Sequence, residues 1–315
     1  MRIGSIEHRD LACGEFVNSF KSFEASEVQW PELDRMSAAR VRAMPFWNEA
    51  LNSELVAADR TRRMAEAETD STLREAIGLQ AFEKGRRADL LEGLMRRYGI
   101  KLHRFRGERR RSPEWGYMRM GNGELFDMFF AFGLFRLIAH AQLLPPGLIA
   151  IFEDVMAEEA RHLIFFHNWS ILRSRQAPIH RKPVVIWHRS AAMAVQTVGR
   201  IRTGIRVATT EEAKDPADDF VMWAPSRLWG DAISYRHFIQ ICLGEYRRRM
   251  DVFDPKLPRP LLVPAMVRVV MHLMREPRAT RPARKLPLPE RANQRPVSVS
   301  RTPQHTQSAR FRRPG

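Results

Sequence analysis

Apolar residues recur along the chain at the three- and four-residue spacing of amphipathic helices, and alternation with a period of two is scarce. The pattern predicts four helices of about twenty residues, at about 46–68, 72–98, 123–142 and 148–173. They form two hairpins, joined by a longer crossover that contains the basic run Lys101–Arg111. Four amphipathic helices connected in this way predict an all-α four-helix bundle.

The segments around these helices suggest a division of the chain. We expect an irregular N-terminal segment with short helices at 1–45, the bundle at 46–175, and a helical extension packed on the bundle at 183–274. The remainder, 275–315, is rich in Pro, Ser, Thr and Gln and carries eleven Lys and Arg against Glu276 and Glu290. Such a composition buries too little apolar area to offset the entropy of ordering, so we expect a disordered basic tail.

The charge of the chain is compatible with two interpretations of this tail. The net charge is +16, and +9 of it lies within residues 275–315. The tail is then either a solvated extension or an electrostatic arm that binds nucleic acid or an anionic membrane. The two cysteines, Cys13 and Cys242, form no disulfide framework and no zinc cluster. With no apolar signal segment and no long uncharged apolar run, the sequence predicts a cytoplasmic protein.

Candidate metal-binding residues lie on the predicted helix at 148–173. Glu159 and His162 are three residues apart, so they lie on neighbouring positions of one face. Glu159 shares its face with Phe152, Met156 and Leu163, and a carboxylate in an apolar stripe is costly unless something pairs with it. The pair indicates a metal site, and the alternative is a buried glutamate hydrogen-bonded to a neighbouring helix.

Two further helices repeat the pattern of one acid in an apolar stripe. Glu124 lies at the head of the stripe of the helix at 123–142, and Glu54 shares its face with apolar residues of the helix at 46–68. Glu49 faces mostly polar neighbours, so it is a reserve for Glu54. A dimetal-carboxylate bundle needs one Glu from each of two helices and a Glu-x-x-His from each of the other two. Such ligands suit iron or manganese, and the helix at 72–98 should supply the second Glu-x-x-His.

A family resemblance rests on four segments: "FWNEALNSELVAADR", "LREAIGLQAFEKGRRADLL", "GNGELFDMFFAFGLF" and "EEARHLIFFHNW". Together with "FIQICLGEYRRRMDVFDPKLPRPLLVPAMVRVV", they resemble a bacterial ferritin-like family of uncharacterised proteins over roughly residues 28–275. The resemblance implies a ferritin-like bundle with a non-haem dimetal site and an oxygen-dependent redox role. The ligands that it implies in this chain are Glu54, Glu124, Glu159 and His162.

The helix at 72–98 departs from the family pattern, which has EEARH in both halves. Here the first copy is "EKGRR", which puts Lys84 and Arg87 at the positions of Glu159 and His162. Neither cation can bind a metal, and Glu83 is a reserve ligand rotated by about 100° from the ligand position. Four interpretations are open: a buried salt-bridge network of Lys84 and Arg87 with the three glutamates, a mononuclear site at Glu124, Glu159 and His162, a dimetal site completed by Glu83, or a different register for this helix.

Three functional hypotheses follow from these observations. The first is a ferritin-like protein with a degenerate di-iron site, little or no metal binding, and a structural or binding role. The second is a non-haem oxidoreductase that uses iron or manganese and dioxygen. The third is a basic interaction protein that binds nucleic acid or an anionic membrane through residues 275–315.

Overall fold

The computed structural model describes residues 1–103, 112–180, 182–184, 186–187, 190–191, 193–194 and 233–273. All of them belong to one compact unit, Met1–Glu276. Their structure is all-helical, as expected. The elements are α1 (Ile6–Asn18), η1 (Ala25–Glu27), α2 (Arg35–Ala43), α3 (Trp47–Ala67), α4 (Ser71–Arg97), α5 (Pro113–His140), α6 (Pro146–Gln176), α9 (Tyr235–Met250) and α10 (Leu262–Leu273). The predictions for the basic run and the tail concern residues outside these ranges, apart from 101–103.

The ends of α4 show how local sequence sets a helix. Its N-cap is Asp70, whose carboxylate accepts hydrogen bonds from the backbone N–H groups of Thr72 and Leu73. The helix therefore begins at Ser71, one residue before the predicted start at about 72. The helix ends just before Gly99, whose φ of 68° is strained for residues with a Cβ.

The start of α5 corrects a second boundary. We expected this helix to begin at about Gly123, but it begins ten residues earlier, with Pro113 in its first turn. Glycines lower helix propensity, which hides this part of the helix in the sequence. The structure explains one of them: a Cβ on Gly121 would lie 2.3 Å from the ring of Phe166, so glycine lets α5 approach α6 closely.

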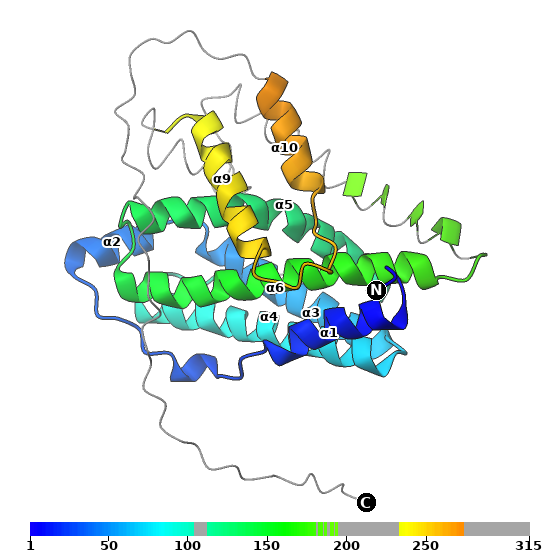
Figure 1. Cartoon of the computed structure of the whole chain (residues 1–315). Helices are drawn as coiled ribbons and strands as arrows, with labels where there is room; N and C mark the ends of the chain where they lie inside the picture. Colours follow the sequence, from blue (N-terminus) through cyan, green and yellow to red (C-terminus); the bar gives the residue numbers. More distant parts are fainter. Residues whose placement is uncertain are drawn as a thin grey trace, which may run out of the picture. The chain divides into compact units, whose positions relative to one another are not determined.

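Helices α3 to α6 form a bundle in which α4 and α5 run in the same direction (Figure 1). The residue numbers of contacting partners increase together along both helices, as they do in parallel helices. The Tyr117 hydroxyl donates to Gln80 Oε1 at 2.6 Å, and further along Lys84 pairs with Glu124. Each of the pairs α3–α4 and α5–α6 is an antiparallel hairpin, and α3 also contacts α5. The end of α4 and the start of α5 therefore lie at opposite ends of the bundle.

The N-terminal segment covers one side of this bundle. Helix α1 contacts both α4 and α6, so it lies over the groove between them (Figure 1). Its Phe16 is buried, with its ring centroid 4.9 Å from that of Phe165 and 5.6 Å from that of His162. We expected irregular structure or short helices at 1–45, and the thirteen-residue α1 is the longest helix of that segment.

Two C-terminal helices complete the unit. Helix α9 contacts α5 and α6, and a Cβ on Gly133 of α5 would lie 2.3 Å from Cys242 Sγ of α9, so this approach also needs glycine. Helix α10 contacts α5 and α9. Both lie within the helical extension predicted at 183–274, of which most residues from 195 to 232 lie outside the described ranges. No helix in the described part of the chain is long and apolar enough to cross a membrane.

Candidate functional site: a buried ionic network

The interior of the bundle brings together the residues that the sequence singled out. Each of the four helices contributes at least one charged side chain near the middle of its length. The set comprises Glu54 from α3, Lys84 and Arg87 from α4, Glu124 from α5, and Glu159 and His162 from α6. Lys84, Arg87, Glu159 and His162 are buried, whereas Glu54 and Glu124 are half-buried.

Lys84 forms an ion pair with Glu124 Oε1. Its side chain has no exposed surface. Burial by itself would lower the pKa of the Lys84 ammonium, but the carboxylates of Glu124 and Glu159 outweigh it and the pKa lies above its ordinary value. Lys84 is therefore a permanent cation at neutral pH.

Arg87 bridges two further glutamates from different helices. One terminal nitrogen lies 2.8 Å from Glu159 Oε1 and 3.2 Å from Glu54 Oε2. Burial opposes the charge on Arg87, but Glu159 and then Glu54 raise the pKa of the guanidinium above its usual value. Lys84 and Arg87 thus form the contacts with Glu54, Glu124 and Glu159 that a salt-bridge network requires.

His162 is held as a neutral imidazole within this network. Its Nε2 lies 2.7 Å from Glu83 Oε2. Its Nδ1 lies 3.3 Å from Nη2 of Arg87, the nitrogen that also contacts Glu54 and Glu159. These partners fix the tautomer, because Nε2 must donate to the carboxylate while Nδ1 accepts from the guanidinium. Burial, followed by the charges of Arg87 and Lys84, lowers the pKa of His162 well below its ordinary value.

A second set of ion pairs surrounds the first, and the sequence did not reveal it. Arg86 donates to Glu158 Oε1 at 2.6 Å, and Arg161 donates to Glu83 Oε1. The pairs are crossed, since the arginine of each helix binds the glutamate of the other. All four side chains are buried.

These arginines also attach the N-terminal segment to the bundle. Arg86 donates to the backbone carbonyl of Lys21 at 2.7 Å, and Arg161 donates to that of Ser19. Arg86 additionally lies over the ring of Phe23, 3.8 Å from its centroid. A signal for this network was present in the sequence: Glu-x-x-Arg occurs at 83–86 and again at 158–161, in the two copies that align with each other.

Neither reserve ligand, Glu49 or Glu83, is positioned to bind a metal ion beside the other glutamates. Glu49 is exposed, because it lies on the outer face of α3. Glu83 is fully buried, but its two oxygens already pair with Arg161 and His162. Glu83 therefore acts in the structure as an acceptor within the outer set of ion pairs.

The donor set fits two metal ions poorly. Atoms that would have to ligate are engaged by cations, namely Glu124 Oε1 by Lys84, and Glu54 Oε2, Glu159 Oε1 and His162 Nδ1 by Arg87. The network holds five glutamates and four cations, so its net charge is −1 when every glutamate is ionised. Two divalent ions would change it to +3 in a buried space. Among the described residues, no group of three or more His, Cys, Asp and Glu side chains is arranged to hold a metal ion.

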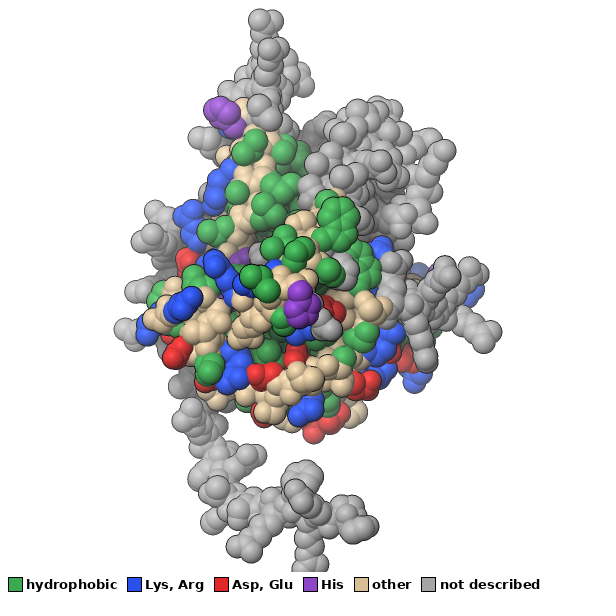
Figure 2. All heavy atoms as spheres, turned by 90° about the vertical axis from the view of Figure 1, so that its right-hand side faces the viewer, with side chains coloured by type: hydrophobic (Ala, Val, Ile, Leu, Met, Phe, Trp, Pro, Cys, Tyr) green, Lys and Arg blue, Asp and Glu red, His purple; other side chains and the backbone are tan. Residues whose placement is uncertain are grey.

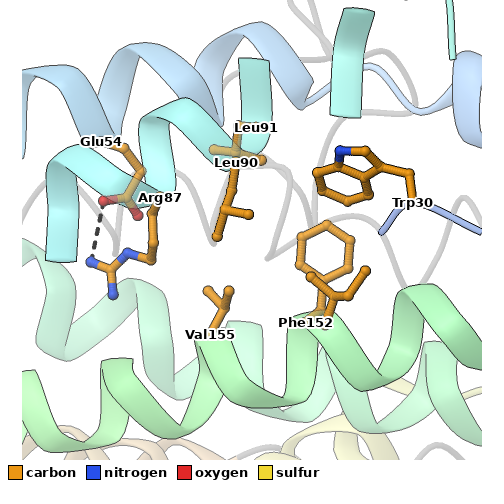
Figure 3. A pocket seen from close by; sticks show the side chains of 8 residues that line it. Trp30, Glu54, Arg87, Leu90, Leu91, Phe152 and Val155 are labelled. Carbon is orange, nitrogen blue, oxygen red and sulfur yellow. Dashed lines mark hydrogen bonds and ion pairs between the residues drawn. The ribbon is translucent and has the colours of Figure 1, made fainter. Parts of the chain in front are cut away.

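A small cavity reaches the network from one side of the bundle. Its volume is about 40 Å³, and Figure 3 shows Glu54 and Arg87 at one end with Trp30 and Phe152 at the other. Leu90, Leu91, Ile151 and Val155 complete an otherwise apolar lining. Polar contacts are confined to the ionic end, so the cavity gives the network limited access to small molecules such as water.

The excess of one carboxylate predicts a pH dependence of stability. Burial raises the pKa of Glu124 to about 7 against the opposing effect of Lys84, and burial with the nearby Glu83 raises that of Glu158 to about 7. A carboxyl whose pKa is raised by folding stabilises the fold while protonated, and loses that contribution as pH rises through the folded value. We expect the free energy of unfolding to fall by about 1–2 kcal/mol between about pH 6.5 and 8.

Chemical denaturation across this pH range measures the effect. The range avoids the opposing contribution of His162, whose lowered pKa makes the fold less stable only as pH falls below about 6.5. Glu124→Gln should weaken the dependence, because the amide cannot ionise and Glu158 alone then contributes. A stability that rises from pH 6.5 to 8 would contradict the prediction.

Comparison of the chain with protein-family models, curated proteins and solved structures found no match.

Proposed function

We propose that this chain is a ferritin-like bundle in which two cations replace the metal ions, and that its role is structural or binding. The observation that carries the proposal is the position of Lys84 and Arg87, which pair inside the bundle with the three glutamates that the resemblance assigns as ligands. The long crossover between the parallel α4 and α5 supports the ferritin-like topology, since one long connection is typical of such bundles.

The physical reason for the replacement is electrostatic. Three carboxylates in one bundle interior repel each other, and metal ions would normally offset this repulsion. Lys84 and Arg87 supply positive charge at the same place without binding any ion. The proposed protein keeps the bundle and its acidic residues, and gives up the iron or manganese cofactor.

Metal analysis tests this proposal. The wild-type chain, expressed in iron-supplemented medium, should contain well under one iron per chain. Lys84→Glu/Arg87→His introduces a Glu-x-x-His into the first copy, on α4, and should contain clearly more, because a second such pair completes the ligand set. Arg97→Glu/Arg96→His makes the same charge changes at the exposed end of α4 and should resemble the wild type. Two irons per wild-type chain would refute the proposal.

A mononuclear oxidoreductase is the second candidate, and one observation favours it. The Oε2 atoms of Glu124 and Glu159 are buried and form no hydrogen bond within the described structure. With His162, whose Nδ1 would first have to leave Arg87, they would supply three donors for one iron or manganese ion. This candidate predicts about one iron per wild-type chain in the same assay, together with loss of that iron in Glu159→Gln. The interaction of residues 275–315 with nucleic acid or an anionic membrane stays a separate prediction, tested by deleting them.

A further inference from the structure

A second cavity lies between α5, α6 and the start of α10, and its volume is about 70 Å³. We call it the α10 cavity. None of its lining residues belongs to the ionic network, so the cavity is separate from the function proposed for that network. The lining residues in the described part of the chain are Asn122, Leu125, Phe166, His167, Ser170, Met193, Pro260, Leu262 and Val263.

Hydrogen bonds hold one wall of the α10 cavity in place. The segment between α9 and α10 supplies this wall, and two helices bind it: Asn168 Nδ2 donates to the carbonyl of Pro258 at 3.1 Å, and the Tyr246 hydroxyl donates to that of Pro260 at 2.6 Å. Leu262 is 47% exposed, so it lies at the opening. Concave, mostly apolar and preformed spaces of this kind are typical of ligand sites.

Asn122 contributes a buried polar group without a partner. Its side chain is 4% exposed, and its amide nitrogen donates to the carbonyl of Met118 at 2.8 Å. Because a carbonyl can only accept, this bond distinguishes the two amide atoms and leaves Oδ1 directed elsewhere. Within the described part of the chain, Oδ1 accepts no hydrogen bond, which is costly for a buried acceptor. A donor from a molecule in the α10 cavity would satisfy it.

Ser170 adds a second acceptor to a lining that is otherwise largely apolar. Its hydroxyl donates its one proton to the carbonyl of His167 at 2.9 Å, so any further hydrogen bond at Oγ is one that it accepts. Six of the nine lining residues are apolar. Water in such a space makes few of the hydrogen bonds that it makes in bulk, so the apolar part of a ligand displaces it at a gain.

The surroundings of the α10 cavity disfavour a charged ligand. None of its described lining residues is Asp, Glu, Lys or Arg. A buried ammonium or carboxylate would therefore lose its hydration without an opposite charge to compensate. In Figure 2, hydrophobic side chains gather in the upper part of the unit, which contains α10, and most acidic ones lie in the lower half. The ligand that fits is neutral.

We propose that the α10 cavity binds a short-chain alcohol. The hydroxyl donates to Asn122 Oδ1, and the alkyl chain contacts Leu125, Phe166 and Val263. An amide would bring further polar atoms, which the apolar lining would leave unpaired. The volume of about 70 Å³, against roughly 150 Å³ for a cavity that holds benzene, suits a molecule of about three to five non-hydrogen atoms.

Titration of the full chain with 1-butanol, followed by the NMR signal of the Met193 ε-methyl group, tests the proposal. Met193 lines the cavity, and Met193→Leu assigns its signal. Diethyl ether is the matched probe, because it is an isomer of 1-butanol without a donor. 1-Butanol should bind about three- to tenfold more tightly, which is the effect of one neutral hydrogen bond. Asn122→Leu keeps the shape of the side chain without its acceptor, and should make the two probes bind alike.

Two substitutions at the opening test the location without changing Asn122. Leu262→Trp places a larger side chain at the opening and should abolish saturable binding of both probes. Leu261→Trp alters the neighbouring residue, which is 59% exposed and does not line the cavity, and should bind both probes as the wild type does. Circular dichroism confirms that each variant is folded.

Several outcomes would overturn the proposal. One is a wild type without a saturable shift of the Met193 signal at non-denaturing concentrations of 1-butanol. Another is equal affinity of the wild type for the two isomers, or an unchanged preference for 1-butanol in Asn122→Leu. Binding that persists in Leu262→Trp, or an equal loss in Leu261→Trp, would show that the probes bind elsewhere.

Discussion

Replacing Arg87 by methionine is expected to lower the free energy of unfolding by about 3–5 kcal/mol. Arg87 is 1% exposed and pairs with Glu54 and Glu159. Methionine fills much of the same volume, so the loss is electrostatic and not the cost of a large cavity. Without the guanidinium, Lys84 is the remaining cation facing three carboxylates, and at least one of them must stay unpaired or take up a proton.

Urea denaturation at neutral pH, compared with Arg96→Met, measures this effect. Arg96 lies on the same helix and pairs with Glu92, but its side chain is 70% exposed. Its replacement should change stability by no more than about 0.5 kcal/mol, since water screens exposed pairs. Equal effects of the two substitutions would show that the buried ion pairs of Arg87 contribute no more to stability than the exposed pair of Arg96.

Replacing Lys84 by methionine should also cost about 3–5 kcal/mol near pH 8, and a second substitution should restore most of it. Lys84 is fully buried, and within the described network it alone forms an ion pair with Glu124. Lys84→Met leaves that carboxylate without its cation. Adding Glu124→Leu removes the unpaired charge, and an apolar pair in place of a buried ion pair is often neutral or stabilising.

A double-mutant cycle makes this prediction quantitative. The single variants Lys84→Met and Glu124→Leu should each be less stable than the double variant, with a coupling energy of roughly 1–3 kcal/mol. The cost of Lys84→Met should shrink as pH falls below about 7, because Glu124 is then protonated in the wild type as well. Additive effects of the two substitutions would contradict a direct interaction between these side chains.

The fold was largely predictable because helices depend on local pattern. The apolar spacing of the four long segments identifies α3, α4, α5 and α6, and Gly99 marks the end of α4 through its φ. The start of α5 was missed because Gly121 lowers helix propensity locally, while its benefit, the close contact with Phe166, depends on a helix 45 residues later in the chain. Contacts of that kind are not encoded in any local window of sequence.

The candidate site was likewise predictable in part: its residues could be selected from the sequence, but not all of their partners. Spacing on a helix face was enough to select Glu54, Glu124, Glu159 and His162, and alignment of the two Glu-rich copies was enough to show that Lys84 and Arg87 correspond to Glu159 and His162. Glu83 shows the limit of that reasoning: its rotation from the ligand position was evident, but its partners, Arg161 and His162, belong to another helix. Glu158 and Arg86 were missed for the same reason.

The sequence by itself determined that this protein is a helical bundle with acids in its interior and two cations where ligands are expected, because side-chain chemistry and helical period are properties of short segments. Only the tertiary structure decided which acid each cation binds, that a crossed outer set of Arg–Glu pairs surrounds them, and which apolar side chains of α10 stay exposed. Each of these depends on distances between helices, and those distances follow from how the whole interior packs.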